Sequence, residues 1–248
     1  MKTNSLFELF TINLKIFIRN RNGLFWTLIM PVGLYVGLSV LPIPSLKNSL
    51  SYKDYILPGM IAYTIMSSGI YSLAYWMVDL KSRGIIKRLS ATPIKPWQLI
   101  LSLVASRIVI MFIQALVITF VGVVFFHAKV SPNFLLPALF IILGGGVFLA
   151  FGLLIASVAD SYESAAPLTT IVGMPFAFLG NIFFPTENLP KFLQFLSNIL
   201  PITYLADGLR QAYLYPFDLN KIGFDILILT VWLILLLLIT VKVFKLKE

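Results

Sequence analysis

Long apolar runs are the feature that most constrains how this chain can fold. Six runs, each close to the length that crosses a bilayer, alternate with short polar or proline-containing stretches. They cover residues 24–41, 56–78, 99–126, 135–158, 165–184 and 222–243. Inside a bilayer, backbone amides find partners only within the protein, so such runs predict transmembrane helices. We therefore expect an all-α polytopic membrane protein with six transmembrane helices, organised as one domain over residues 1–248.

Composition agrees with this fold class. The chain is 59% hydrophobic and only 12% charged, whereas soluble domains are roughly 25% charged. It contains no cysteine, which excludes disulfides and thiolate-ligated metal sites. Its net charge of +9 comes from cations that flank the apolar runs. Orientation in a membrane therefore explains the charge better than a nucleic-acid surface does.

The distribution of positive charge predicts the topology. With six spans, thirteen of the nineteen lysines and arginines fall on the side of both termini. The six cations on the other side are Lys47, Lys53, Lys129, Lys191, Arg210 and Lys221. The positive-inside bias therefore places the N- and C-termini in the cytoplasm.

The N-terminal residues 1–22 predict an amphipathic helix at the membrane interface. Their polar side chains recur with the helical period, and these are Asn4, Glu8, Thr11, Lys15, Arg19 and Asn22. Leucine, isoleucine and phenylalanine occupy the other face. The segment is too polar to span a bilayer, so we expect it to lie in the plane of the membrane surface.

Residues 185–221 do not read as a simple linker. Two apolar helical patterns, one over 189–200 and one over 204–215, are separated by Pro201. Each is too short to span, so we expect short re-entrant helices on the extracellular side. Such helices predict a lid or outer gate.

Few side chains could carry chemistry. His127 is the sole histidine, which makes an intramembrane enzyme or a histidine metal site a weak hypothesis. Gly144, Gly145 and Gly146 lie within a span and lack the Gly-Lys-Ser/Thr of a phosphate loop, so close helix packing explains them better. The same interpretation applies to Gly33 and Gly37. We expect no cofactor to be bound by this chain.

Polar residues within the spans are also few. Gln114, Thr170 and Asn181 are candidates for lining a transport pathway, with hydrogen bonding between helices as the alternative. Arg107 is expected near the cytoplasmic end of its span, with its charge snorkelling towards water. An ion-coupled transporter or channel usually needs more ionisable groups than these, yet it stays an alternative.

A basic segment at residues 80–96 separates the second and third apolar runs. Its cations are Lys81, Arg83, Lys87, Arg88 and Lys95. The predicted topology places the segment in the cytoplasm, where a soluble partner can bind it.

Three motifs resemble those of type-2 ATP-binding-cassette (ABC) exporter permeases. The stretch from Arg83 to Pro93, RGIIKRLSATP, is similar to the family's first cytoplasmic loop, and Tyr55–Gly59 resembles the Pro-Gly entry to its second span. The stretches 184–190, 200–204 and 208–210 resemble its last extracellular loop. The turn at Asp160–Glu163 departs from the Asn-containing turn that is commoner there, which leaves that cytoplasmic contact open.

The resemblance implies a permease subunit of the bacterial plasma membrane. Its partners would be a second permease copy, membrane lipids and a separate ATPase subunit, which would hold ATP and Mg. The segment would form a cytoplasmic coupling helix, with the contact to the ATPase made by Arg83, Gly84, Lys87, Arg88, Leu89, Thr92 and Pro93. The outer gate would include Pro185, Pro190, Pro201, Tyr204 and Arg210. The cargo would be an amphiphile: a drug, a peptide antibiotic or a lipid-like molecule.

Overall fold

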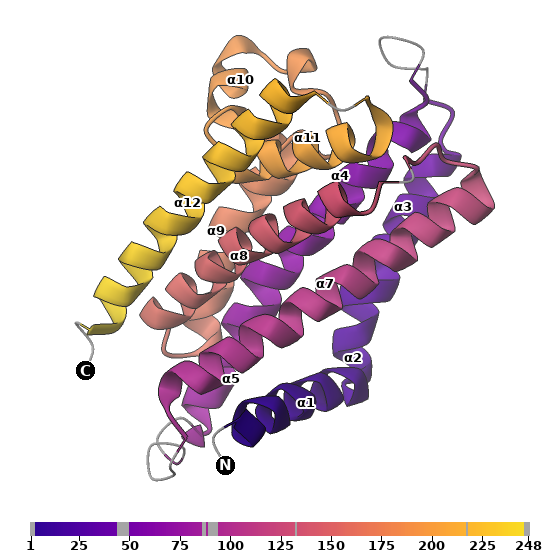
Figure 1. Cartoon of the computed structure of the whole chain (residues 1–248). Helices are drawn as coiled ribbons and strands as arrows, with labels where there is room; N and C mark the ends of the chain where they lie inside the picture. Colours follow the sequence, from indigo (N-terminus) through magenta and orange to yellow (C-terminus); the bar gives the residue numbers. More distant parts are fainter. Residues whose placement is uncertain are drawn as a thin grey trace.

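The fold is a bundle of long helices with shorter helices at one end (Figure 1). A computed structural model describes residues 3–43, 50–85, 88, 94–131, 133–216 and 218–245, and these contain no strand. The helices along the first half are α1 (Thr3–Arg19), α2 (Arg21–Leu24), η1 (Phe25–Ile29), α3 (Met30–Val40), α4 (Tyr52–Ser67), η3 (Ser68–Ser72), α5 (Leu73–Ser82) and α7 (Pro96–Phe126). Those along the second half are α8 (Leu135–Val158), α9 (Tyr162–Leu179), η4 (Thr186–Asn188), α10 (Lys191–Ser197), α11 (Pro201–Leu214) and α12 (Leu219–Lys245).

Five helical stretches among the described residues are long and apolar enough to cross a membrane. They are Arg21–Val40, Tyr52–Ser82, Trp97–Phe126, Leu135–Val158 and Leu219–Val243. Each of the five overlaps a predicted run. The remaining run forms α9, which has 18 residues, two internal prolines and Glu163 in its first turn. That composition is too polar for α9 to join the five, so the sixth span stays a prediction.

The second span begins earlier than its apolar run. The sequence predicts a start near Ile56, whereas α4 begins at Tyr52. Groups at the end of α7 and just after it form hydrogen bonds with the polar residues of this extra turn. Lys53 Nζ donates to the Phe126 carbonyl at 2.8 Å. The Asp54 carboxylate accepts from the Lys129 backbone N–H at 3.1 Å. Hydrophobicity alone could not reveal partners that lie 73 and 75 residues away.

The long helix formed by α4, η3 and α5 occupies the core and packs closely on α8. A Cβ atom at Gly152 would lie 2.3 Å from the Gly69 carbonyl oxygen, so the two backbones touch where η3 widens into a π turn. Gly144 and Gly145 also face tight contacts, from Leu205 and Met111. The packing role predicted for those two glycines is confirmed. A Cβ atom built at Gly33 or Gly37 would have nothing within 4 Å. The close helix packing predicted for this pair is therefore wrong for the part of the chain that the structure describes.

Helix α1 lies across the end of the bundle that also holds the C-terminal end of α12 (Figure 1). Its Asn13 side chain donates to Ser102 Oγ of α7 at 3.1 Å. The helix ends at Arg19 rather than continuing to Asn22, because the Asn20 side chain accepts from the Gly23 N–H at 3.0 Å and caps α2. Phe7, Ile12 and Ile18 are exposed, and their insertion into a membrane surface remains a prediction.

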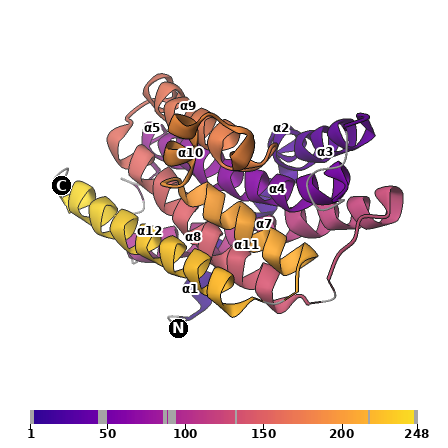
Figure 2. The ribbon, with the colours of Figure 1, turned by 90° about the horizontal axis from the view of Figure 1, so that it is seen from above.

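Helices α10 and α11 lie at the opposite end of the bundle. The sequence predicts them at 189–200 and 204–215, and the structure forms α10 over Lys191–Ser197 and α11 over Pro201–Leu214. Pro201 starts α11 instead of merely breaking the chain, because proline fits the first turn of a helix. Helix α11 packs against α4, α8 and α12, and Figure 2 shows it among them.

The contact between Gly69 and Gly152 gives a first prediction. We expect Gly152→Leu to lower the stability of the folded chain by about 3 kcal/mol, since the new side chain meets backbone that cannot move aside. Gly37→Leu, which adds the same atoms where nothing lies within 4 Å, should leave stability nearly unchanged. Thermal unfolding of the two variants in detergent measures the difference. Equal midpoints would contradict the close packing of α8 on η3.

Candidate functional site

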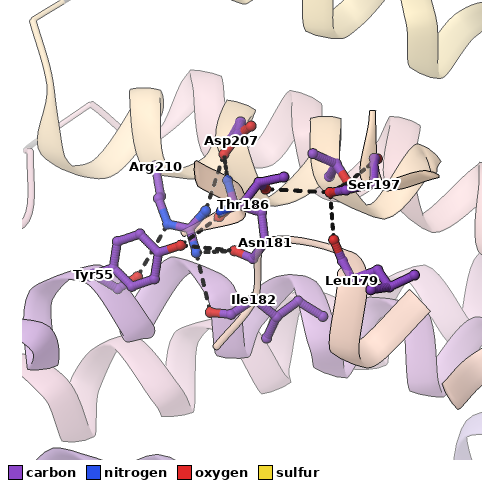
Figure 3. A network of polar contacts seen from close by, with 9 residues as sticks. Tyr55, Leu179, Asn181, Ile182, Thr186, Ser197, Asp207 and Arg210 are labelled. Atoms are coloured by element: carbon purple, nitrogen blue, oxygen red, sulfur yellow. Dashed lines mark hydrogen bonds and ion pairs between the residues drawn. The ribbon is translucent and has the colours of Figure 1, made fainter. Parts of the chain in front are cut away.

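Two polar regions stand out, one at each end of the bundle. The first is the start of the basic segment, where α5 ends and the chain leaves the bundle. The second is a hydrogen-bond network around Arg210, between α4, α11 and the segment that follows α9 (Figure 3).

The basic segment begins with a left-handed turn. Gly84 has φ +66°, a conformation that L side chains rarely adopt, and nothing lies within 4 Å of a Cβ atom built there. The Arg88 backbone N–H donates to the Gly84 carbonyl at 3.1 Å, and the Arg88 side chain is exposed. The four-residue spacing of this hydrogen bond is the spacing found in an α-helix. Lys87, Leu89, Thr92 and Pro93, which the sequence assigns to the same coupling site, lie outside the described residues.

The end of α5 is tied to its neighbours by specific contacts. Arg83 Nε lies 2.8 Å from Asp79 Oδ1 in an exposed ion pair. Lys81 donates to the Ala156 carbonyl and, at 3.5 Å, to the Ala159 carbonyl, both at the end of α8. A displacement applied at Arg83 would therefore reach α5 and α8 together.

The Asp160–Glu163 turn lies beside this region. The Ser161 hydroxyl accepts from the Ser164 N–H at 3.3 Å and caps α9. Tyr162 stacks on Tyr75 of α5 with ring centroids 4.4 Å apart. Tyr162 of the turn and Arg83 at the start of the basic segment border the same cavity, although 79 positions separate them in the sequence.

The network at the other end is organised by one buried guanidinium. Arg210 is 4% exposed, and its Nη1 lies 3.1 Å from Asp207 Oδ1. Its Nε donates to the Tyr55 carbonyl at 3.3 Å, and its Nη2 donates to the carbonyls of Asn181 and, at 3.2 Å, Ile182. The guanidinium also stacks on the Tyr55 ring, 3.8 Å from its centroid. All of these groups converge in Figure 3.

Asn181 is the second hub of this network. It adopts a left-handed φ of 55°, which asparagine tolerates better than most residues. Its Oδ1 accepts from the Tyr55 hydroxyl at 2.6 Å and from the Thr186 N–H at 3.1 Å, and its Nδ2 donates to Asp207 at 2.5 Å. The side chain therefore joins α4, α11 and the segment after α9. Its role as a pathway-lining residue stays a prediction, and the hydrogen-bonding alternative is the arrangement seen.

Glycine lets the elements around this network pack closely. A Cβ atom at Gly59 would lie 2.4 Å from the Ile182 carbonyl oxygen, and one at Gly208 would lie 2.1 Å from the Phe140 ring. Two motifs that are far apart in the sequence, Tyr55–Gly59 and the one ending in Arg210, therefore meet at a single place.

The other predicted site residues occupy varied positions. Gln114 is buried, and its Nε2 donates to the Thr27 carbonyl at 2.5 Å, while Thr170 is exposed and its hydroxyl donates to the Ala166 carbonyl. Among the predicted gate residues, Pro185, Pro190 and Pro201 directly precede or begin η4, α10 and α11. The Tyr204 hydroxyl donates to the Asn198 carbonyl. The prolines thus set the ends of the short helices.

Sequence reasoning missed Asp207 and the pairing of Tyr55 with Arg210. A signal was available for Asp207, because it stands three residues before Arg210 on a predicted helix, and that spacing favours an ion pair. The contact between Tyr55 and Arg210 spans 155 residues, and neither period nor charge pattern in the sequence points to it.

Removing the guanidinium tests the network. We expect Arg210→Ala to lower stability by about 3 kcal/mol or more, because it leaves buried carbonyls without a donor. Arg210→Lys should recover only part of the loss, because one ammonium group cannot reproduce the planar fork. The control is Lys221→Ala. The exposed Lys221 ammonium lies 3.8 Å from the Asp218 carboxylate, so its removal should change stability by less than about 0.5 kcal/mol. Detergent unfolding of the three variants gives the ranking, and equal losses at Arg210 and Lys221 would refute it.

Comparison with known proteins gives the family. The family model for the ABC-2 type transporter matches residues 4–214. The chain is 26% identical over 192 residues to a Bacillus subtilis (strain 168) protein named as a transport permease, YvfS, covering 77% of this chain and 78% of the relative. It is 24% identical to the Escherichia coli (strain K12) protein YbhR, named as a multidrug ABC transporter permease, covering 69% of this chain and 47% of the relative.

A third relative is the inner membrane transport permease YadH of Escherichia coli (strain K12). It is 25% identical over 67% of this chain and 65% of its own length. The chain therefore spans about half of YbhR and just under two thirds of YadH. Because the family model matches most of the chain, including both polar regions, this multi-pass membrane protein belongs to the ABC-2 type transporter permease family.

Proposed function

We propose that this chain is the membrane subunit of an ABC exporter, moving an amphiphilic substrate outward with ATP hydrolysed by a separate ATPase subunit. The observation that carries the proposal is the family match over residues 4–214, in a sequence of 248 residues that has no phosphate-loop motif of its own. ATP and Mg then belong to the ATPase, and none is assigned to this chain. The names of the relatives, one of which specifies multidrug transport, support an amphiphile as cargo.

The structure supports a specific route for force. The helix formed by α4, η3 and α5 runs from Tyr52 to Ser82, about 45 Å at 1.5 Å per residue. One end leads into the basic segment at Arg83, and the other carries Tyr55 in the Arg210 network. In this proposal the ATPase pushes on the segment, and the helix transmits the movement to the outer network. Breaking that network would release α11 from α4 and open the outer gate.

The π turn η3 lies midway along this helix. Single π turns interrupt the regular hydrogen-bond ladder and are frequent at functional sites. We infer that the helix bends at Ser68–Ser72 when the two ends change their relative tilt. The close contact of Gly69 with Gly152 makes α8 the fulcrum.

Dimerisation and orientation complete the proposal. Both termini face the cytoplasm of a bacterial cell, and a second permease copy supplies the other half of the pathway. In the Arg21–Val40 helix, Pro31 and Tyr35 are the buried residues, so the helix has surface for lipid or for the second copy. In this proposal ATP hydrolysis belongs to the ATPase subunit, and no catalytic site is assigned to this chain.

Gly84 provides the test of coupling. We expect Gly84→Val and Gly84→Glu to abolish permease-dependent ATP hydrolysis, because a β-branched or bulky side chain disfavours φ +66°. Gly84→Asn should retain most of it, since asparagine tolerates the left-handed region. The measurement is the ATPase activity of the P-loop ATPase that co-purifies with the tagged permease, in proteoliposomes, with membrane insertion checked in parallel.

Two results would refute the coupling role. One is hydrolysis by Gly84→Val equal to that of the parent chain. The other is transport of a fluorescent amphiphile by the purified chain with no ATPase present, which would favour a secondary transporter or channel.

Cysteine labelling tests the topology, and the cysteine-free sequence makes single-cysteine variants simple to interpret. We expect Lys191→Cys and Tyr215→Cys, both at exposed positions near α10 and α11, to react with a membrane-impermeant maleimide added to intact cells. Lys95→Cys, exposed before α7, should react only after the cells are opened. The reverse pattern would overturn the orientation.

A further inference from the structure

Arg107 does not snorkel as the sequence predicts. It lies eleven residues into α7 and is 5% exposed. Its guanidinium faces two aromatic rings, with its carbon 5.2 Å from the centroid of Phe17 in α1 and 5.8 Å from that of Trp76 in α5. Its Nη1 atom is buried and has no hydrogen-bond partner.

A cation held in this way is costly unless an anion joins it. Ring faces attract a guanidinium, yet each contact contributes only about 0.5–2 kcal/mol, and rings accept no strong hydrogen bond. A buried charge normally has a counter-charge or a full set of acceptors, and Arg210 at the other end of the bundle has both. Arg107 has neither among the described residues. Its surroundings suit a ligand that brings the missing oxygens.

A cavity of about 590 Å³ lies beside Arg107. It is bounded by α1, the start of the first span, α5 and α7, at the same end of the bundle as the basic segment. Its volume falls in the range of small-molecule sites. The wall combines Arg107 with hydrogen-bonding side chains and aromatic rings, namely Asn13, Asn20, Trp26, Tyr71 and Trp76.

The charge of the wall is positive. Arg83 and Asp79 also line the cavity, but they pair with each other at 2.8 Å. Arg107 is therefore left as the uncompensated charge. The side-chain hydroxyls and amides around it add donors, which an anion needs.

We propose that this cavity binds the phosphate-bearing headgroup of a membrane amphiphile, with Arg107 as the anion ligand. A guanidinium matches phosphate oxygens through parallel N–H donors. The amphiphile, rather than a free anion, is favoured by the aromatic wall and by the exposed apolar residues of α1, the helix that contributes Asn13 and Phe17 to the wall; among these exposed residues are Phe7 and Ile18. The site depends neither on the transport direction nor on the ATPase; that this end of the bundle faces the cytoplasmic leaflet rests on the proposed function.

Binding of dodecyl phosphate to the purified chain in dodecyl maltoside tests the proposal. Quenching or enhancement of tryptophan fluorescence reports occupancy, since Trp26 and Trp76 line the cavity. We expect saturable binding that weakens at least tenfold in Arg107→Gln and is partly restored in Arg107→Lys. Lys242→Gln, which removes an exposed cation from α12, should bind within twofold of the parent chain.

Stability separates a binding role from a structural one. If Arg107 awaits an anion, Arg107→Gln without ligand should unfold at the same temperature as the parent chain or higher, and dodecyl phosphate should stabilise only the parent. If Arg107 instead stabilises the fold through its contacts with Phe17 and Trp76, Arg107→Gln should unfold at a lower temperature than the parent chain. That result would refute the proposal.

The source of the anion is settled by competition. Inorganic phosphate at equal concentration should displace little dodecyl phosphate, because it lacks the chain. Equal affinity for inorganic phosphate would assign the site to a free anion and overturn the amphiphile. Unchanged dodecyl phosphate binding by Arg107→Gln would remove Arg107 from the site altogether. Each readout uses the chain alone, so failure of ATPase coupling leaves the result interpretable.

Discussion

The ends of interrupted helices within this protein require hydrogen-bond donors, and the arrangement around α9 depends on how that need is met. Helix α9 ends at Leu179, and its last carbonyls have no partner in the helix. The Ser197 hydroxyl donates to the Leu179 carbonyl at 2.5 Å, and Arg210 donates to the carbonyls of Asn181 and Ile182. Side chains from α10 and α11 thus replace the water that a soluble protein would use, which fixes the two short helices against the bundle.

Three arginines, at the two ends of the bundle, have different surroundings. Arg210 is surrounded by carbonyl and carboxylate oxygens and acts as a fixed connector. Arg107 is surrounded by rings and a cavity. Arg83 is exposed beside Asp79. Arg210 is thus a structural brace, whereas a ligand site at Arg107 and a docking surface at Arg83 are our proposals. Arginine keeps its charge even where it is buried, as at Arg107 and Arg210.

Much of the fold was predictable from the sequence, because bilayer-length apolar runs have few structural solutions. The fourth run agrees with α8 at both ends, Leu135 and Val158. The start of α4 at Tyr52 was not predictable, since it depends on partners at the end of α7. Similarly, the sequence motifs located Tyr55 and Arg210 separately, but their contact follows from tertiary packing. Burial of Arg107 escaped prediction for the same reason, because its neighbours Phe17 and Trp76 come from two other helices.

The π turn η3 also sets an angular relationship between the two ends of the central helix. One residue inserted into an α-helix rotates everything beyond it by about 100° around the axis. The five residues Ser68–Ser72 therefore determine which direction Lys81 faces once Tyr55 has been fixed against Arg210. Lys81 binds the end of α8 and Tyr55 binds Arg210 of α11. The number of residues in the π turn, rather than their side chains, allows both contacts to form at once. In this helix, the number of residues between the two contacts therefore fixes how one half is rotated relative to the other.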